Sequence, residues 1–311
     1  MHIVSEKEVE FSRLLFLYAF SYILIHMEHE VSLSAIHGMA PEFLSTVALF
    51  TAPINIEEAV ARLEILWSLP VQASLSDVDP SMGRGNSGNI YHFSYQGMTM
   101  MLTPVSSPLE VENDGTLPPH EFHVMITCFA PVRDASTGHI NTYTNSQGET
   151  VPVVPQGIIE ESARRRMAVQ AHTLMVQMLD SLMREESAVG VFRRELGVVH
   201  SAQMIVELAD SLSKGEAPLL LWVRVVTARP DLVSGRTFGL PLFGHLDVEI
   251  TESTRTEDDV YALLSNIANY VISSDFFLLP GQTIGYRDGE KLALTQNTSP
   301  VDGNNVIRID F

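Results

Sequence analysis

The sequence predicts an α+β protein with mixed or antiparallel sheets, helices packed on one face, and two ferredoxin-like halves sharing one core. Two-residue turns at Gln96-Gly97 and Asp288-Gly289 each join two extended runs, so antiparallel hairpins are expected in both halves. Because strands and helices do not alternate regularly, a plain doubly wound parallel sheet is excluded. A chain of 311 residues, 45% of them hydrophobic and 18% charged, can bury a large core.

The first half is predicted to span residues 43–184. Asn55 is a suitable helix N-cap, and Glu57 and Glu58 suit the positive end of the helix that follows. A later, longer helix has a broad apolar face of leucine and methionine, which indicates that it covers a sheet. In chain order, the predicted elements are a strand at 43–50, a helix ending near Trp67, strands at 71–78, 90–95, 98–103 and 120–129, and the long helix at 158–183.

The second half is predicted to span residues 185–311. Residues 219–226 are an apolar run between two prolines, as expected of a strand buried on both faces. Two glycines and a proline within residues 237–244 indicate a bulge or a close backbone approach. The other predicted elements are strands at 188–192, 198–200, 245–250, 292–295 and 306–311, and helices at 202–212, capped by Ser201, and 257–273, capped by Thr254 or Thr256.

The polar face of the strand at 245–250 has two interpretations. Strict alternation places His245, Asp247 and Glu249 on one face of this strand. An imidazole and two carboxylates could hold a divalent metal or act as acid and base, with His200 or His123 as a further member. The simpler interpretation is the solvated outer face of a half-covered sheet, because such a sheet requires the same alternation.

Several segments of the second half resemble a known family. They are residues 219–223, Thr237-x-Gly239, Phe243-Gly244 and Glu249-Ile250, followed by an amphipathic helix. This succession is similar to the C-terminal part of a bacterial family, domain of unknown function (DUF) family 4261. The resemblance extends from about Phe43 to the C-terminus, and it implies no activity and no catalytic residue.

The composition argues against several classes of function. A formal net charge of −19 repels phosphate backbones, so neither nucleic-acid binding nor an anionic membrane partner is expected. Cys128 is the only cysteine and lies in an apolar run, so we expect a buried, inert thiol in a reducing cytoplasm. Gly83, Gly85 and Gly88 lack the following Gly-Lys-Ser/Thr and helix of a phosphate site, so they indicate a loop. No cofactor is expected.

Residues 1–42 are predicted to be an apolar helical extension outside both halves. The segment Leu14–Ile25 is almost entirely apolar, but it is too short to cross a bilayer comfortably, and the preceding glutamates do not suit a signal peptide. Three interpretations stay open. The segment docks on its own domain or on a second subunit, giving a homodimer; it anchors the protein on a membrane surface; or it precedes the true start, at Met27 or Met39.

Three hypotheses for function follow. The favoured one is a non-catalytic cytoplasmic module that binds a protein partner through an acidic surface, because serine-nucleophile, phosphate-loop and dinucleotide motifs are missing from the sequence. The second is a metal-dependent or hydrolytic enzyme that uses His245, Asp247 and Glu249. The third is a membrane-associated protein that uses residues 14–25.

Overall fold

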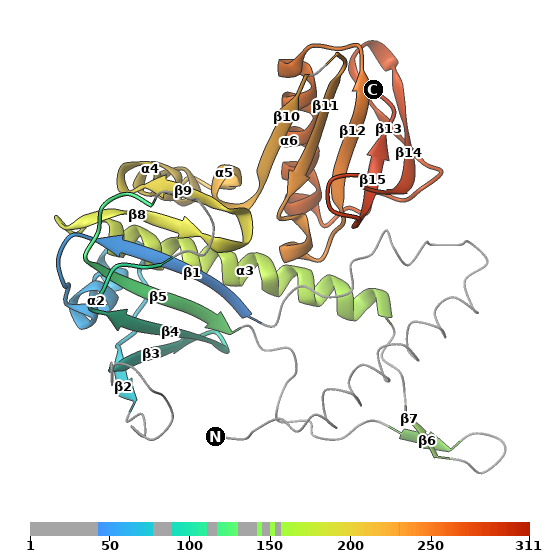
Figure 1. The fold of residues 1–311 in the computed structure, drawn as a ribbon. Helices are drawn as coiled ribbons and strands as arrows, with labels where there is room; N and C mark the ends of the chain where they lie inside the picture. Colours follow the sequence, from blue (N-terminus) through green and yellow to red (C-terminus); the bar gives the residue numbers. More distant parts are fainter. Residues whose placement is uncertain are drawn as a thin grey trace.

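The fold comes from a computed structural model that describes residues 43–76, 89–110, 117–129, 142–144, 150–152, 157–229 and 231–311. These residues form a seven-stranded sheet, a six-stranded sheet and a small pair of strands, β6 (Thr142–Thr144) and β7 (Thr150–Pro152) (Figure 1). The predicted α+β class is therefore confirmed. The predictions for the extension at 1–42 and for the glycine-containing loop at 83–88 lie outside the described residues.

The first sheet is antiparallel throughout, with helices packed on one face (Figure 1). The order β4-β5-β1-β8, with one helix after β1 and another after β5, is a ferredoxin-like β-α-β-β-α-β arrangement, and its fourth strand lies beyond the predicted end of the first half at residue 184. Across the sheet, the strands are β2 (Ser74–Ser76), β3 (Ile90–Tyr95), β4 (Met98–Val105), β5 (Phe122–Phe129), β1 (Phe43–Phe50), β8 (Ala188–Arg193) and β9 (Val198–Ser201), and the helices are α2 (Ile56–Trp67), α3 (Gly157–Met183) and α4 (Ala202–Ser213).

The second sheet is mixed, because β12 and β15 pair in parallel while its other neighbouring strands are antiparallel. One long helix, α6 (Glu257–Ser274), packs against β10, β11 and β12. Since this sheet carries one long helix and not two, its arrangement differs from that of the first half. In order across the sheet, the strands are β10 (Arg224–Ala228), β11 (Val233–Phe238), β12 (Asp247–Ser253), β15 (Asn305–Ile309), β14 (Lys291–Thr298) and β13 (Thr283–Gly285).

Local signals placed the helix starts and the first hairpin correctly. The side chains of Asn55, Ser201 and Thr256 each accept a hydrogen bond from a backbone amide in the first turn of α2, α4 and α6. Gln96 and Gly97 both have positive φ, as a two-residue hairpin turn requires. The strand predicted at 71–78 is shorter, because only β2 pairs with β3.

The division predicted after residue 184 does not coincide with the division between the sheets. Strands β8 and β9 follow that position but complete the first sheet beside β1. Helix α4 also packs on this sheet and on α3. The chain therefore passes to the second sheet only after α4, through the short helix α5 (Leu219–Trp222).

The prediction of one strand at 219–226 is wrong, because its first part is the helix α5 and only β10 is extended. The helical turn directs both Leu221 and Trp222 into the core, while Leu220 is 47% exposed. The close backbone approach predicted nearby is confirmed at Gly239, whose φ is +117°. A Cβ there would lie 2.7 Å from the carbonyl oxygen of Trp222. Gly239 precedes the 3₁₀ turn η5 (Leu240–Phe243).

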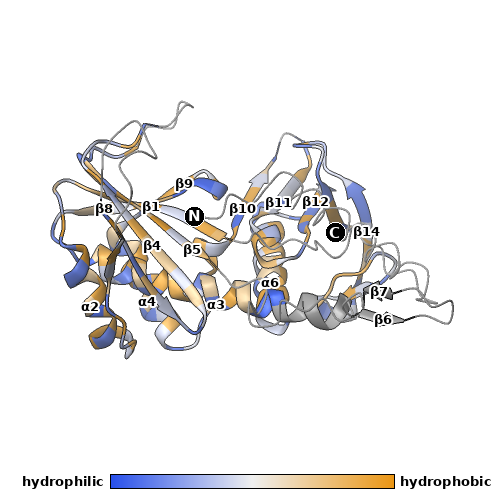
Figure 2. Ribbon diagram, turned by 90° about the horizontal axis from the view of Figure 1, so that it is seen from below, coloured by the Kyte–Doolittle hydropathy of each residue, from blue (hydrophilic) through white to orange (hydrophobic). Residues whose placement is uncertain are grey.

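One continuous hydrophobic core extends through both sheets, as predicted. Helix α3 joins the two parts: its buried His172 stacks on Phe243 of η5 at 4.1 Å between ring centroids. Figure 2 shows hydrophobic residues along β4, β5 and α6, on the elements that enclose this core. Within the described ranges, no helix has the length and hydrophobicity needed to span a bilayer.

Candidate functional site

The polar face predicted for residues 245–250 is buried, so its interpretation as a solvated outer face is wrong. Strand β12 itself begins only at Asp247. His245, Asp247 and Glu249 are only 5%, 7% and 3% exposed. Burying carboxylates costs several kcal/mol per group unless cations and hydrogen-bond donors surround them. Strands β11 and β15, on either side of β12, supply these partners together with η5 and the turn before β15.

Asp247 is held by donors from β11 and η5. Its Oδ1 accepts hydrogen bonds from the Thr237 hydroxyl at 3.0 Å and the Leu240 amide at 3.2 Å. The guanidinium of Arg236 lies 4.0 Å from Oδ2. Burial raises the pKa of Asp247 to about 7, and the Thr237 hydroxyl and Arg236 oppose this rise only in part. The carboxyl group is therefore close to half protonated at neutral pH.

Glu249 belongs to a chain of paired charges. Its Oε1 accepts a hydrogen bond from the Ser299 hydroxyl at 2.6 Å, and its Oε2 accepts one from Arg308 at 2.8 Å. Ser299 in turn accepts a hydrogen bond from Arg236 at 2.6 Å. Arg236 donates two more, at 2.8 and 2.9 Å, to the two oxygens of Asp302, and this pairing lowers the pKa of Asp302 to about 2.

We call this group the Arg236 network: Arg236, Asp247, Glu249, Ser299, Asp302 and Arg308. It contains two guanidinium groups and three carboxyl groups, and one of the carboxyls holds a proton for much of the time near neutral pH. The network is therefore nearly neutral, and each carboxyl already has a hydrogen-bond donor. Its geometry suits a buried clamp between β11, β12 and the turn before β15.

The third predicted ligand, His245, faces another environment. Its ring lies 5.9 Å from that of Phe277, near the ion pair of Arg165 with Asp275. Burial, followed by the positive charge of Arg165, lowers the pKa of His245 to about 4, so the ring is neutral at pH 7. His245 is thus separated from the bonding partners of Asp247 and Glu249.

His123 and His200 lie on strands of the first sheet, whereas Asp247 and Glu249 lie on the second. Across the part of the chain that the structure describes, no three His, Cys, Asp or Glu side chains form a group that could hold a metal. Metal binding at the β12 face stays a prediction.

The arginines of the network were missed by sequence reasoning, although a signal was present. Arg236 and Arg308 each lie within a short strand. A charged residue in the interior of a strand predicts either a solvated face or a buried carboxylate partner. Asp247 and Glu249, on the strand between the two arginines, are the buried carboxylate partners of Arg236 and Arg308.

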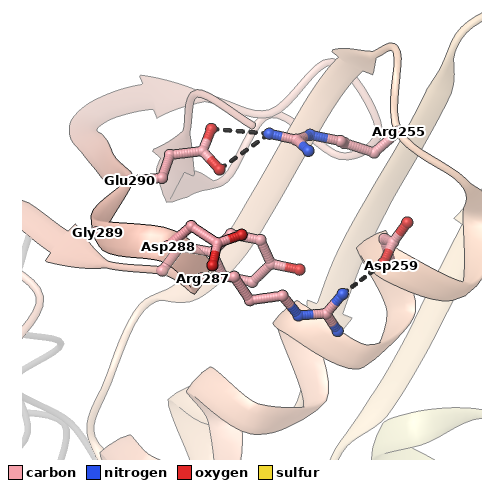
Figure 3. A pocket seen from close by; sticks show the side chains of 7 residues that line it. Arg255, Asp259, Arg287, Asp288, Gly289 and Glu290 are labelled. Atoms are coloured by element: carbon pink, nitrogen blue, oxygen red, sulfur yellow. Dashed lines mark hydrogen bonds and ion pairs between the residues drawn. The ribbon is translucent and has the colours of Figure 1, made fainter.

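A second polar site is an open pocket of about 530 Å³ between the start of α6 and the turn joining β13 to β14 (Figure 3). Arg255 donates two hydrogen bonds, at 2.8 and 2.9 Å, to the two carboxylate oxygens of Glu290. Arg287 donates one to Asp259 at 3.3 Å. We call this site the Arg255 pocket; it is lined by Arg255, Asp259, Tyr286, Arg287, Asp288, Gly289 and Glu290.

Aromatic rings support the floor of the Arg255 pocket. Phe311 packs edge-on against Tyr286 at 4.9 Å between centroids, and the guanidinium of Arg255 lies 5.2 Å from the Phe311 ring. Arg287 lies 5.3 Å from the ring of Tyr286. These contacts orient both arginines toward the pocket. Sequence reasoning had read Asp288-Gly289 only as a turn, because nothing local connects it with α6.

The surface beside the pocket is acidic. Glu257 and Asp258 are exposed in the first turn of α6, next to Asp259. The Thr256 hydroxyl holds the pKa of Asp259 below its usual range, and Arg287 contributes in the same direction. Including Asp288 and Glu290, five carboxylates therefore surround two arginines.

Comparison with known proteins identifies a family model that matches the C-terminal part of the chain. Residues 236–310 match the family model described as Domain of unknown function (DUF4261). The matched range contains the whole Arg236 network and every residue that lines the Arg255 pocket. The predicted extension of the resemblance back to about Phe43 lies outside this match. No curated protein and no solved structure matches the chain significantly.

Proposed function

We propose that this chain, whose residues 236–310 match the DUF4261 family model, is a non-catalytic module that binds a protein partner at the Arg255 pocket and the acidic surface beside it. The observation that carries the proposal is the open pocket lined by paired opposite charges. Sites for small molecules are mostly apolar and enclosed, whereas rims of protein interfaces are polar and open.

The partner is expected to present basic side chains around an acidic one. The five carboxylates in and beside the pocket favour lysine or arginine on the partner, and the net charge of −19 accelerates its approach. Arg255 and Arg287 suit a partner carboxylate, because guanidinium groups bind carboxylates in two-point contacts. Exposed ion pairs contribute only about 0–1 kcal/mol, so a partner can open the existing pairs at little cost.

The test is affinity capture from host lysate with the tagged full-length chain, its Arg255→Glu/Arg287→Glu variant and a control. The control is Arg194→Glu, an exposed arginine in the short turn between β8 and β9 of the first sheet. We expect a stoichiometric partner in captures with wild type and the control, lost with the pocket variant and weakened by salt. A partner retained equally by all three proteins would refute binding at the pocket.

A metal-dependent or hydrolytic enzyme is the second candidate, favoured by one observation. The pKa of Asp247, raised to about 7, is that of a group able to accept and return protons near neutral pH. On this proposal Asp247→Asn removes a hydrolytic activity while the fold and partner capture persist. If wild type captures the partner but shows no hydrolytic activity, the enzyme proposal is refuted and only the binding proposal stands.

Two finer proposals concern location. A cytoplasmic protein suits the single free cysteine, Cys128, which is buried and whose pKa burial raises to about 12. Membrane association through residues 14–25 concerns a segment outside the described residues. Flotation of the full chain with anionic lipid vesicles separates this alternative from the other two, because only a membrane-associated protein would rise with the vesicles.

A further inference from the structure

The outer face of the first sheet, opposite the helices, carries almost no charge. Part of it is buried, because Val47 and Leu49, on the same face of β1 as Phe43, are 7% and 0% exposed. Helices α3 and α4 pack on the other face, which buries the alternate residues of β1 and β5. A solvated outer face ordinarily carries polar and charged side chains. Here Arg193 is the only Lys, Arg, Asp or Glu in the seven strands, and it is buried and donates to the Leu221 carbonyl.

Large apolar side chains stand on this uncharged face. Phe43 of β1 pairs with Phe129 of β5, their rings 5.9 Å apart, and they are 53% and 41% exposed. Met125, four residues along β5 from Phe129, is 43% exposed. Val199 of β9 is 39% exposed. We call these four residues the outer apolar patch. Exposed apolar residues that gather on one face mark a surface that another segment covers.

The chain itself contains a segment of matching chemistry. Residues 14–25, LLFLYAFSYILI, contain no charged side chain, in a protein of net charge −19. The chain leaves this segment and enters β1 at Phe43, which is itself part of the outer apolar patch. We propose that residues 14–25 of the same chain pack on the outer apolar patch.

The length of the connection fits this occupant. Residues 26–42 lie between the segment and β1, and seventeen residues can span at most about 55–60 Å. A sheet of seven strands is about 30 Å wide, because neighbouring strands lie about 4.8 Å apart. The segment can therefore reach every part of the patch. A short tether gives an effective concentration in the millimolar range, so it favours the chain's own segment over that of a second copy at micromolar protein.

Cross-linking in the full-length chain tests the proposal directly. The photoreactive residue p-benzoylphenylalanine replaces Phe129 in the patch or, as a control of matched exposure, Tyr261 of α6 at 40%. After illumination, peptide mass spectrometry identifies the cross-linked partner. We expect position 129 to link to residues 14–25 at the mass of one chain, with a yield that dilution does not change, and position 261 not to do so.

Other outcomes overturn the proposal. Products at the mass of two chains, with a yield that falls on dilution, would assign the patch to a second copy. Products that avoid residues 14–25, or equal yields from both positions, would exclude the segment as the occupant. A second variant, Leu17→Asp/Phe20→Asp, should lower the yield from position 129 at least several-fold, whereas His26→Asp/His29→Asp, outside the segment, should not. Equal yields from the two variants would also overturn it.

Discussion

The raised pKa of Asp247 predicts that Asp247→Asn stabilises the protein more as the pH increases. The folded state holds a proton on Asp247 up to a pKa of about 7, while the unfolded chain releases it near the ordinary value of 3.8. Between these values the folded state binds more protons, so the contribution of this group to the unfolding free energy falls as pH rises. Asparagine mimics the protonated carboxyl and keeps an oxygen that can accept from Thr237 and Leu240.

The magnitude follows from the interval between the two pKa values. At roughly 1.4 kcal/mol per pH unit, the interval from 3.8 to about 7 corresponds to about 4 kcal/mol. About 2–3 kcal/mol of this loss falls between pH 5 and pH 8, because the unfolded chain has already released its proton at pH 5. The wild type should lose this amount relative to Asp247→Asn over that range.

Urea unfolding of both proteins at pH 5 and pH 8 measures the effect. The quantity to compare is the difference in unfolding free energy between variant and wild type at each pH, because the buried histidines change the stability of both proteins equally. Glu252→Gln, an exposed change in the same strand, is the control. If the difference between Asp247→Asn and wild type is the same at both pH values, Asp247 is not protonated in the folded protein, and the reasoning is refuted.

Three further predictions use the same unfolding assay or simple labelling. Asp302→Ala leaves Arg236 with no carboxylate at hydrogen-bond distance and should lower the unfolding free energy by about 2 kcal/mol at pH 7; an unchanged value would contradict a role in the network. Gly239→Ala places a side chain at a φ of +117° against the Trp222 carbonyl and should lower the unfolding free energy by at least about 2 kcal/mol. Gly281→Ala, also at positive φ but in open space, should lower it by about 1 kcal/mol, and equal losses would disprove the clash. Cys128 should resist maleimide until urea unfolds the protein, and rapid native labelling would contradict its burial.

Features set by neighbours in sequence were predictable. The caps at Asn55 and Ser201 and the Gln96-Gly97 turn depend on residues within one helical turn or hairpin, and all three are confirmed. The apolar run at 219–226 was read wrongly, because hydrophobicity alone does not separate a buried strand from a buried helical turn. Only the packing of Trp222 against Phe243, at 5.4 Å between centroids, decides between them.

Features set by distant residues were not predictable. Alternation placed Asp247 and Glu249 on one face, but it could not tell whether that face meets water or arginines from other strands. The pairing of β8 with β1 joins residues more than a hundred positions apart, and β9 joins the sheet through β8, so the boundary between the sheets could not be read locally. The near absence of charged residues from the seven strands was visible in the sequence, but its meaning required knowing that they form one sheet.

The central position of β15 has a consequence for folding during synthesis. β15 lies between β12 and β14, although it is the last of the six strands to leave the ribosome. At 5–20 residues per second, the roughly fifty residues between β12 and β15 take about 3–10 s to make. During that time Glu249 has not met Arg308, and the edge of β12 is unpaired. The first sheet has the opposite order, because β1, an interior strand between β5 and β8, is made first. Nascent chains paused after β12 and before β15 should therefore hold a folded first sheet beside an incomplete second sheet. The unpaired edge of β12 can then bind a chaperone or aggregate.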